Sequence, residues 1–179
     1  VLQAGLRARV ATAPFSAGGE TFERGSIVLP VANQPLAAAA IRDLLAKAAA
    51  RFHVDIFGLA SGLSSGVNLG SPSFDPVTAP RAVMLIGDGT RGYETGEVWH
   101  LLDQRYEMPL TMVATDDAKK LAWDRYQTLI LVNGNYTMLN DEVDELRAWL
   151  RGGGRLIATK GAVNWLRSQN LLDWQDAEG

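Results

Sequence analysis

Residues 83–104, VMLIGDGTRGYETGEVWHLLDQ, join an apolar run to a glycine-rich turn and then to a segment with helical periodicity. The apolar run predicts a buried strand over 81–87, and the later segment predicts a helix over 94–107 that begins near Thr95. The glycine spacing is that of a dinucleotide-binding loop and is carried by Gly87, Gly89 and Gly92. A strand, a turn and a helix in this order form the first half of a parallel βαβ unit.

Strands alternate with helices from this point to the end of the chain. Further strands are predicted over 109–114, 126–134 and 155–161, and helices over 140–154 and 162–172. Such alternation implies parallel pairing through right-handed crossovers. The sequence therefore predicts an α/β fold, with an open, mostly parallel sheet, helices on both faces and a flavodoxin-like or related strand order.

The predicted helices carry recognisable end signals and apolar faces. In the helix over 140–154, Asn140 or Asp141 is expected to cap the first turn, and Gly152 is expected to take the left-handed position after the last turn. Its face toward the sheet is predicted to consist of Val143, Leu146 and Leu150. The apolar stripe of the helix over 94–107 is predicted to consist of Val98, Leu101, Leu102 and Tyr106. Three tryptophans on helices are expected to pack in the core: Trp99, Trp149 and Trp165.

The N-terminal part is predicted to hold strands and one helix. Residues 6–30 suggest two strands around a turn at Ser16, Gly18 and Gly19. A helix is predicted over 34–54, and a short strand over 54–61. Residues 61–80 are rich in Gly, Ser and Pro and are expected to form a long loop. Residues 1–60, 61–80 and 81–179 are thus interpreted as parts of one domain, 1–179, in a fragment of a longer protein.

Composition narrows the function classes. The chain has 179 residues, of which 47% are hydrophobic and 21% charged, as in ordinary globular proteins. Its net charge of −3 provides no basic surface, so no nucleic-acid partner is expected. No apolar run reaches the roughly 18 residues of a membrane span, so no membrane partner is expected. The absence of cysteine excludes disulfides, thiolate zinc sites and cysteine nucleophiles. The oligomeric state and the compartment stay open.

Two stretches carry a resemblance to a known family: 80–89, PRAVMLIGDG, and 93–113, YETGEVWHLLDQRYEMPLTMV. In the second, Glu94-Thr95-Gly96 is followed by Leu101-Leu102-Asp103, a helix-start pattern of that family. The chain resembles the class I glutamine-amidotransferase-like domain at the C-terminal end of some bacterial zinc carboxypeptidase-like proteins. The stretches 18–30, 126–134 and 146–162 are similar in style, so the resemblance covers most of the chain.

The resemblance implies where an amidotransferase nucleophile would lie. In that family a cysteine occupies a tight strand-to-helix turn, and the matching segment here is LIATKGAVNWL, with Thr159 near the nucleophile position and Lys160 beside it. No cysteine is present and no histidine follows, so neither the nucleophile nor its base carries over. The resemblance therefore implies a non-catalytic accessory domain, which supports the peptidase domain of the same chain or binds a ligand.

Zinc is expected only upstream of this fragment. The chain has two histidines, His53 and His100, and His100 stands three residues before Asp103 within a predicted amphipathic helix. No metal site and no cofactor are therefore expected within 1–179. A His-x-x-Glu peptidase site would precede Val1, and the resemblance is compatible with a secreted or periplasmic parent protein.

The loops after the predicted strands would meet at one edge of the sheet, where open α/β sheets bind ligands. The candidate crevice residues are Asp88, Gly89, Arg91, Glu94, Asn133, Asn135, Thr159 and Lys160. Two alternatives use the same edge. One is a small hydrolase that draws its nucleophile and base from Thr159, Lys160, Asp88 and Glu94. The other is a nucleotide-binding module that uses the three loop glycines, with Asp116 as the ribose-binding acid.

Overall fold

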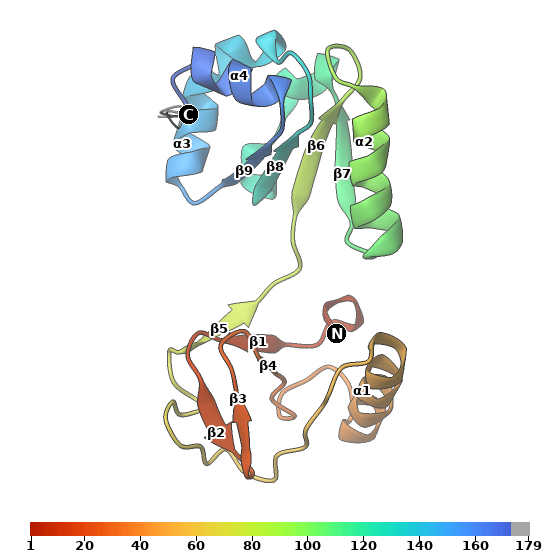
Figure 1. The fold of residues 1–179 in the computed structure, drawn as a ribbon, viewed down its shortest axis with the longest axis vertical. Coiled ribbons are helices and arrows are strands. Elements are labelled where there is room, and N and C mark those ends of the chain that lie inside the picture. Colours follow the sequence, from red (N-terminus) through yellow and green to blue (C-terminus); the bar gives the residue numbers. More distant parts are fainter. Residues whose placement is uncertain (173–179) are drawn as a thin grey trace, which may run out of the picture. The chain divides into compact units, whose positions relative to one another are not determined.

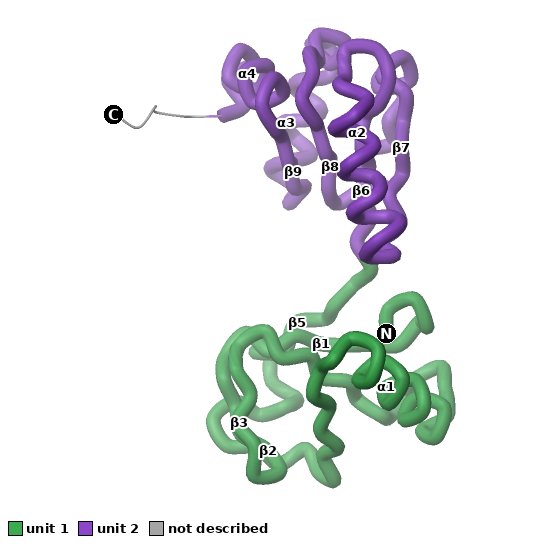
Figure 2. Tube along the Cα trace, turned by 45° about the vertical axis from the view of Figure 1, so that its right-hand side comes forward, with its two compact units in different colours: residues 1–79 green, residues 80–179 purple. Residues whose placement is uncertain are grey.

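The structure, a computed structural model, describes residues 1–172. The chain divides into two compact units, Val1–Ala79 and Pro80–Gly179, which Figure 2 shows in different colours. The sequence predicts one domain, 1–179, whereas the boundary between the two units falls at the end of the segment 61–80. The candidate residues all belong to the second unit.

The first unit is built from short antiparallel strands. Its three-stranded sheet has the order β4-β1-β5, with β1 (Ala8–Ala11), β4 (Ile27–Val28) and β5 (Phe74–Val77). Strands β2 (Phe15–Ala17) and β3 (Glu20–Phe22) form a hairpin. Gly18 and Gly19 have φ values of 62° and 87°, which the two-residue turn requires. The predicted turn is therefore confirmed for the two glycines, whereas Ser16 lies in β2. Four short strands form here in place of the two predicted.

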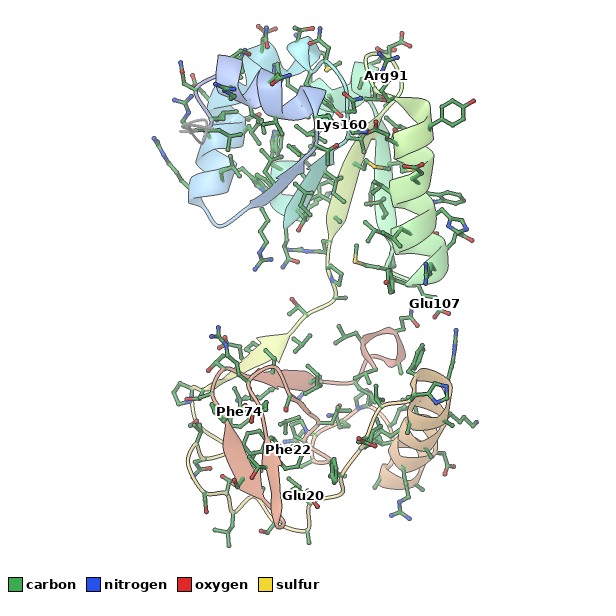
Figure 3. All side chains as sticks on the ribbon, in the orientation of Figure 1. Glu20, Phe22, Phe74, Arg91, Glu107 and Lys160 are labelled. Carbon is green, nitrogen blue, oxygen red and sulfur yellow. The ribbon has the colours of Figure 1, made fainter. Side chains whose placement is uncertain are left out.

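Two predictions for the first unit are wrong. Residues 54–61 form no strand, and Phe57 is about half exposed. The segment 61–80 contains strand β5, which pairs with β1. Phe74 is buried and packs edge-on against Phe15, with 5.2 Å between ring centroids. Pro76 obscures this strand in the sequence, but β5 lies at the edge of its sheet, where proline is tolerated. Figure 3 labels Phe74 and Phe22 in this core.

Helix α1 (Ala38–Phe52) confirms the helix predicted over 34–54. Ile41 is its buried residue, and most of its other side chains are half-buried or exposed. The helix ends at His53, whose φ of 52° places it in the left-handed conformation. A 3-10 helix, Leu2–Ala4, precedes the first strand.

The second unit contains a four-stranded parallel sheet with the order β7-β6-β8-β9, and the α/β prediction is confirmed at this level. Its elements appear in Figure 1. The strands are β6 (Ala82–Ile86), β7 (Leu110–Ala114), β8 (Thr128–Leu131) and β9 (Arg155–Ala158). The helices are α2 (Gly92–Trp99), α3 (Val143–Arg151) and α4 (Gly161–Ser168). Shorter 3-10 helices cover Thr115–Lys120, Trp123–Arg125 and Thr137–Glu142.

Helices cover both faces of this sheet, as predicted. Successive side chains of a strand point to opposite faces. Val83 and Leu85 pack in one core with residues of α3 and α4, among them Leu146 and Leu166, whereas Met84 packs in a second core with α2 residues. The predicted face of α3 is confirmed, since Val143 and Leu150 pack beside Leu146. Of the tryptophans, Trp149 and Trp165 join the first core and Trp99 the second, whereas Trp174 lies outside the described residues.

Helix α2 begins three residues earlier than predicted, at Gly92. It continues into a π-helix, His100–Arg105, which has more residues per turn than an α-helix. The predicted apolar stripe is therefore only partly correct. Val98 and Leu102 pack against the core, whereas Leu101 and Tyr106 are exposed.

The predicted caps of α3 are also wrong, because the 3-10 helix Thr137–Glu142 precedes it without a break. The side chain of Asn140 instead accepts a hydrogen bond from the indole of Trp165, at 3.0 Å, and Asp141 forms an ion pair with Lys119. After α3, Gly153 has a φ of 99° and takes the left-handed position that was predicted for Gly152. No helix within residues 1–172 has the length and apolar character needed to cross a membrane.

Truncation of a core leucine is expected to lower the free energy of unfolding more than truncation of an exposed leucine. Leu146 is 1% exposed in the core, and Leu146→Ala is expected to lower the free energy of unfolding by about 2–5 kcal/mol. Leu101 is 41% exposed, and Leu101→Ala is expected to cost less than about 1 kcal/mol. Urea unfolding followed by circular dichroism measures both, and equal losses would contradict the assigned packing.

Candidate functional site

The candidate site lies at the carboxyl ends of β6, β8 and β9. The chain moves from β6 to β7 on one side, then returns across β6 to reach β8 on the other side. The loops after β6 and β8 therefore diverge at a topological switch point, where open α/β sheets form ligand crevices. The turn between β9 and α4 lies at the same edge.

Backbone hydrogen bonds join the loops after β6 and β8. The N–H of Arg91 donates to the carbonyl of Asn133, and the N–H of Asn135 donates to the carbonyl of Gly89, both at 2.9 Å. An added Cβ at Gly134 would lie 2.6 Å from the carbonyl oxygen of Gly89. Only glycine permits this approach, so the two loops close part of the crevice with their own backbones.

The loop glycines serve the turn. Gly87 and Gly89 have φ values of 103° and 85°, which favour glycine. The third glycine of a dinucleotide loop permits close packing of helix on strand, yet a Cβ at Gly92 would meet nothing within 4 Å. The N–H of Thr90 donates to Gly87, and that of Arg91 to Asn133, so neither is directed at a phosphate. This geometry does not favour the nucleotide-binding alternative, although α2 begins at Gly92 as that alternative requires.

The sharp turn between β9 and α4 is centred on Lys160. Thr159, which the sequence analysis places near the nucleophile position, still donates its N–H to Leu131 and so continues the sheet ladder. Lys160 has φ 49° and ψ −116°, a conformation that usually needs glycine. A strained residue between a strand and a helix is the feature that exposes the nucleophile in hydrolase elbows. Here that position holds a lysine.

Three elements meet around the side chain of Glu94, which belongs to α2. The Lys160 ammonium contacts Glu94 Oε1 at 2.7 Å, and the Asn133 amide donates to the same oxygen at 3.2 Å. The other end of the Asn133 amide accepts a hydrogen bond from the N–H of Gly161, at 3.1 Å. An added Cβ at Gly161 would lie 2.8 Å from the carbonyl oxygen of Gly134. We call Glu94, Asn133, Lys160 and Gly161 the elbow cluster; Figure 3 labels Lys160 and Arg91 at this end of the sheet.

The electrostatics of the elbow cluster favour a charged pair. The hydrogen bond from Lys160 lowers the pKa of Glu94, burial opposes this effect, and the hydrogen bond from Asn133 adds to it. The side chain of Glu94 is 23% exposed and that of Lys160 is 66% exposed. Nearby, burial raises the pKa of Tyr136, and the charge of Glu94 raises it further. The neutral Tyr136 hydroxyl donates to the carbonyl of Val132 at 2.8 Å.

The remaining candidates lie elsewhere along the same edge. Asp88, Gly89 and Asn135 line a separate pocket of about 320 Å³, to which Asp116 also contributes. Sequence reasoning missed the other lining residues of this pocket, Thr115, Thr137 and Met138. It also missed Gly161. The sequence indicates these four residues only by their position, because each lies between the end of a strand and the next helix or in the first turn of that helix.

Metal chemistry finds no support in the described part of the chain. Within residues 1–172, no group of three or more histidine, aspartate or glutamate side chains could hold a metal ion. His100 is exposed, and Asp103 accepts a hydrogen bond from its neighbour Gln104. The spacing of His100 and Asp103 therefore has no visible role as a ligand pair.

No family model, curated protein or solved structure matches this chain.

The strain at Lys160 predicts that a glycine variant is more stable than an alanine variant, the reverse of the usual order. Lys160→Ala and Lys160→Gly both remove the ion pair with Glu94, but only glycine readily adopts a φ of 49°. Although glycine also loosens the unfolded chain, the relief of strain is larger, and Lys160→Gly is expected to be more stable than Lys160→Ala by about 1 kcal/mol. Urea unfolding of the two variants gives the difference, and a more stable alanine variant would refute the strain.

The ion pair predicts a loss of stability in acid. Because the pKa of Glu94 is lower in the folded chain than the ordinary value of 4.5, the pair contributes fully above that pH and less as the pH falls through the folded value. The difference in unfolding free energy between the wild type and Glu94→Gln is therefore expected to be constant near neutrality and to shrink below pH 4.5. Urea unfolding across this pH range measures it.

A second glutamate on the same helix supplies the control. Glu97 is exposed and forms no ion pair with any described residue. Glu97→Gln should therefore change stability less than Glu94→Gln at neutral pH. A Glu94→Gln difference that stays constant down to strongly acidic pH would contradict the assigned pair.

Proposed function

We propose that the unit Pro80–Gly179 is a non-catalytic, class I amidotransferase-like accessory domain of a larger zinc carboxypeptidase-like protein. In this role it supports the peptidase domain of the same chain or binds a ligand. The strand order, numbered along the unit, is 2-1-3-4, which is compatible with a flavodoxin-like arrangement. The resemblance in residues 80–89 and 93–113 adds to this support.

The observation that carries the proposal is the residue found at the strained position of the turn between β9 and α4. Lys160 holds the strained position, and its ammonium is paired with Glu94 at 2.7 Å. In nucleophile elbows, the N–H of the residue after the nucleophile helps to stabilise the oxyanion. Here that residue is Gly161, whose N–H donates to the Asn133 side chain. Both the nucleophile position and its oxyanion donor are thus engaged with other groups of the domain.

The hydrolase alternative has no observation in its favour. A nucleophilic lysine needs a desolvated site without an opposing charge, whereas the Lys160 side chain is 66% exposed and contacts a carboxylate. Thr159 has no histidine near it along the chain that could act as its base. Asp88 lines the separate pocket and forms no described contact with Lys160.

Assays of glutamine hydrolysis and of carboxypeptidase activity test the proposed non-catalytic role. The 179-residue chain is expected to release no ammonia from glutamine and no C-terminal amino acid from peptides above the buffer rate. The Thr159→Ala and Lys160→Ala variants serve as controls for contaminating activity, because a contaminant is unaffected by either change. Turnover that either substitution abolishes would overturn the non-catalytic role.

The proposed zinc carboxypeptidase-like protein requires a separate test, since a non-catalytic domain of this kind could belong to many different proteins. Sequencing of the coding region upstream of Val1 is expected to show a His-x-x-Glu pair and a later histidine, the ligands of a zinc carboxypeptidase-like site. An upstream region without these residues would refute the peptidase parent and leave the inactive elbow unaffected.

A further inference from the structure

A polar pocket of about 320 Å³ lies at the carboxyl ends of β6 and β7, apart from the elbow cluster. Asp88 comes from the loop after β6, Asp116 from the 3-10 helix after β7, and Asn135 from the loop after β8. Thr137 and Met138, from the same segment as Asn135, also line it. The pocket is within the size range of small-ligand sites and occupies the edge where α/β sheets bind ligands.

The hydroxyl of Thr115 supports the presence of a ligand site in this pocket. Thr115 is 4% exposed, yet within residues 1–172 its hydroxyl makes no hydrogen bond. Every fully solvent-excluded polar side-chain atom of the described residues has a partner, so this hydroxyl must retain access to the pocket that it lines. It lies beside the turn at Gly87, where an added Cβ would be 3.4 Å from its oxygen. A hydroxyl that has no partner within the fold is free to bond a molecule that enters the pocket.

The charges of the lining define the class of ligand. Asp88 and Asp116 contribute two carboxylates, and no lysine or arginine lines the pocket. The hydroxyls of Thr115 and Thr137 add further hydrogen-bond acceptors, whereas the amide oxygen of Asn135 already accepts the N–H of Thr137, at 3.2 Å. We propose that this pocket binds a small organic cation that carries several N–H donors, such as a guanidinium or a primary ammonium compound. This inference goes beyond the accessory role and does not depend on the zinc-peptidase parent.

A bare metal ion fits the pocket less well. Calcium takes 6–8 oxygen ligands and magnesium requires near-octahedral geometry. The lining offers two carboxylates, the amide of Asn135 and the hydroxyls of Thr115 and Thr137, together with the apolar side chain of Met138. The volume also exceeds what a single ion needs. A guanidinium, by contrast, directs planar N–H donors at carboxylates and fills more of the space.

Titration of the isotope-labelled 179-residue chain with agmatine, followed by amide NMR, tests the proposal. Agmatine carries a guanidinium and an ammonium and is expected to bind at millimolar concentration or below, with shifts at Gly89, Thr115 and Asn135. Tetramethylammonium, a cation without N–H donors, should bind more weakly, as should a Gly-Arg-Gly peptide amide, which is larger than the pocket. Absence of agmatine binding, equal binding of tetramethylammonium, tighter binding of the peptide, or binding of magnesium or calcium alone would each overturn the proposal.

Variants assign the binding to the pocket. Asp88→Asn and Asp116→Asn are each expected to raise the Kd of agmatine by about threefold, and Thr115→Val by about fivefold. Thr115→Val should keep the stability of the wild type, because its hydroxyl makes no internal hydrogen bond. Asp117→Asn is the matched control, since Asp117 pairs with Lys120 and does not line the pocket. Equal Kd values for Asp88→Asn, Asp116→Asn and Asp117→Asn would place agmatine elsewhere and refute the site.

Discussion

The hydrogen bonds of Asn133 hold the carboxyl edge of the parallel sheet together. Its carbonyl accepts the N–H of Arg91, its amide nitrogen donates to Glu94, and its amide oxygen accepts the N–H of Gly161. A single residue after β8 thus connects the loop after β6, helix α2 and the first residue of α4. The orientation of the amide follows from these two partners, because a carboxylate needs a donor and a backbone N–H needs an acceptor.

This arrangement supports the proposal that the edge is inactive as an elbow. The Asn133 amide engages the N–H that would face an oxyanion, and it holds Glu94 where the carboxylate meets Lys160. The strained backbone of Lys160 costs free energy of the order of 1–3 kcal/mol, which the surrounding contacts must offset. The close approach of Gly134 to Gly89 and of Gly161 to Gly134 packs these turns against one another, with no room for a side chain between them. These contacts therefore hold the strained conformation of Lys160 in place.

The parallel sheet could be predicted from the sequence because its strands are short apolar runs between clear helices. Residues 81–87 and 126–134 show this pattern, and the alternation of elements leaves parallel pairing as the natural arrangement. Strand β5 could not be found in this way, because Pro76 and the surrounding Gly and Ser residues resemble a loop and its pairing with β1 is long-range. The caps predicted for α3 are wrong because Asn140 and Asp141 lie in the preceding 3-10 helix, and their side chains contact Trp165 and Lys119, which are distant in the chain.

The sequence predicts which residues lie at this edge of the sheet, but it does not predict which of them contact one another. Position after a strand end brought Glu94, Asn133 and Lys160 into one set, although they are far apart in the chain. Which neighbour occupies the strained position, Thr159 or Lys160, depends on one residue of register in β9, and a one-residue slip exchanges the roles of adjacent side chains. The division of the edge into two sites could not be predicted from the sequence, because it depends on a hydrogen bond between two loops. The Gly89–Asn135 hydrogen bond closes the space between β6 and β8, so that Asp88 and Asn135 line a pocket with Thr115, whereas Glu94 and Lys160 pair at the elbow.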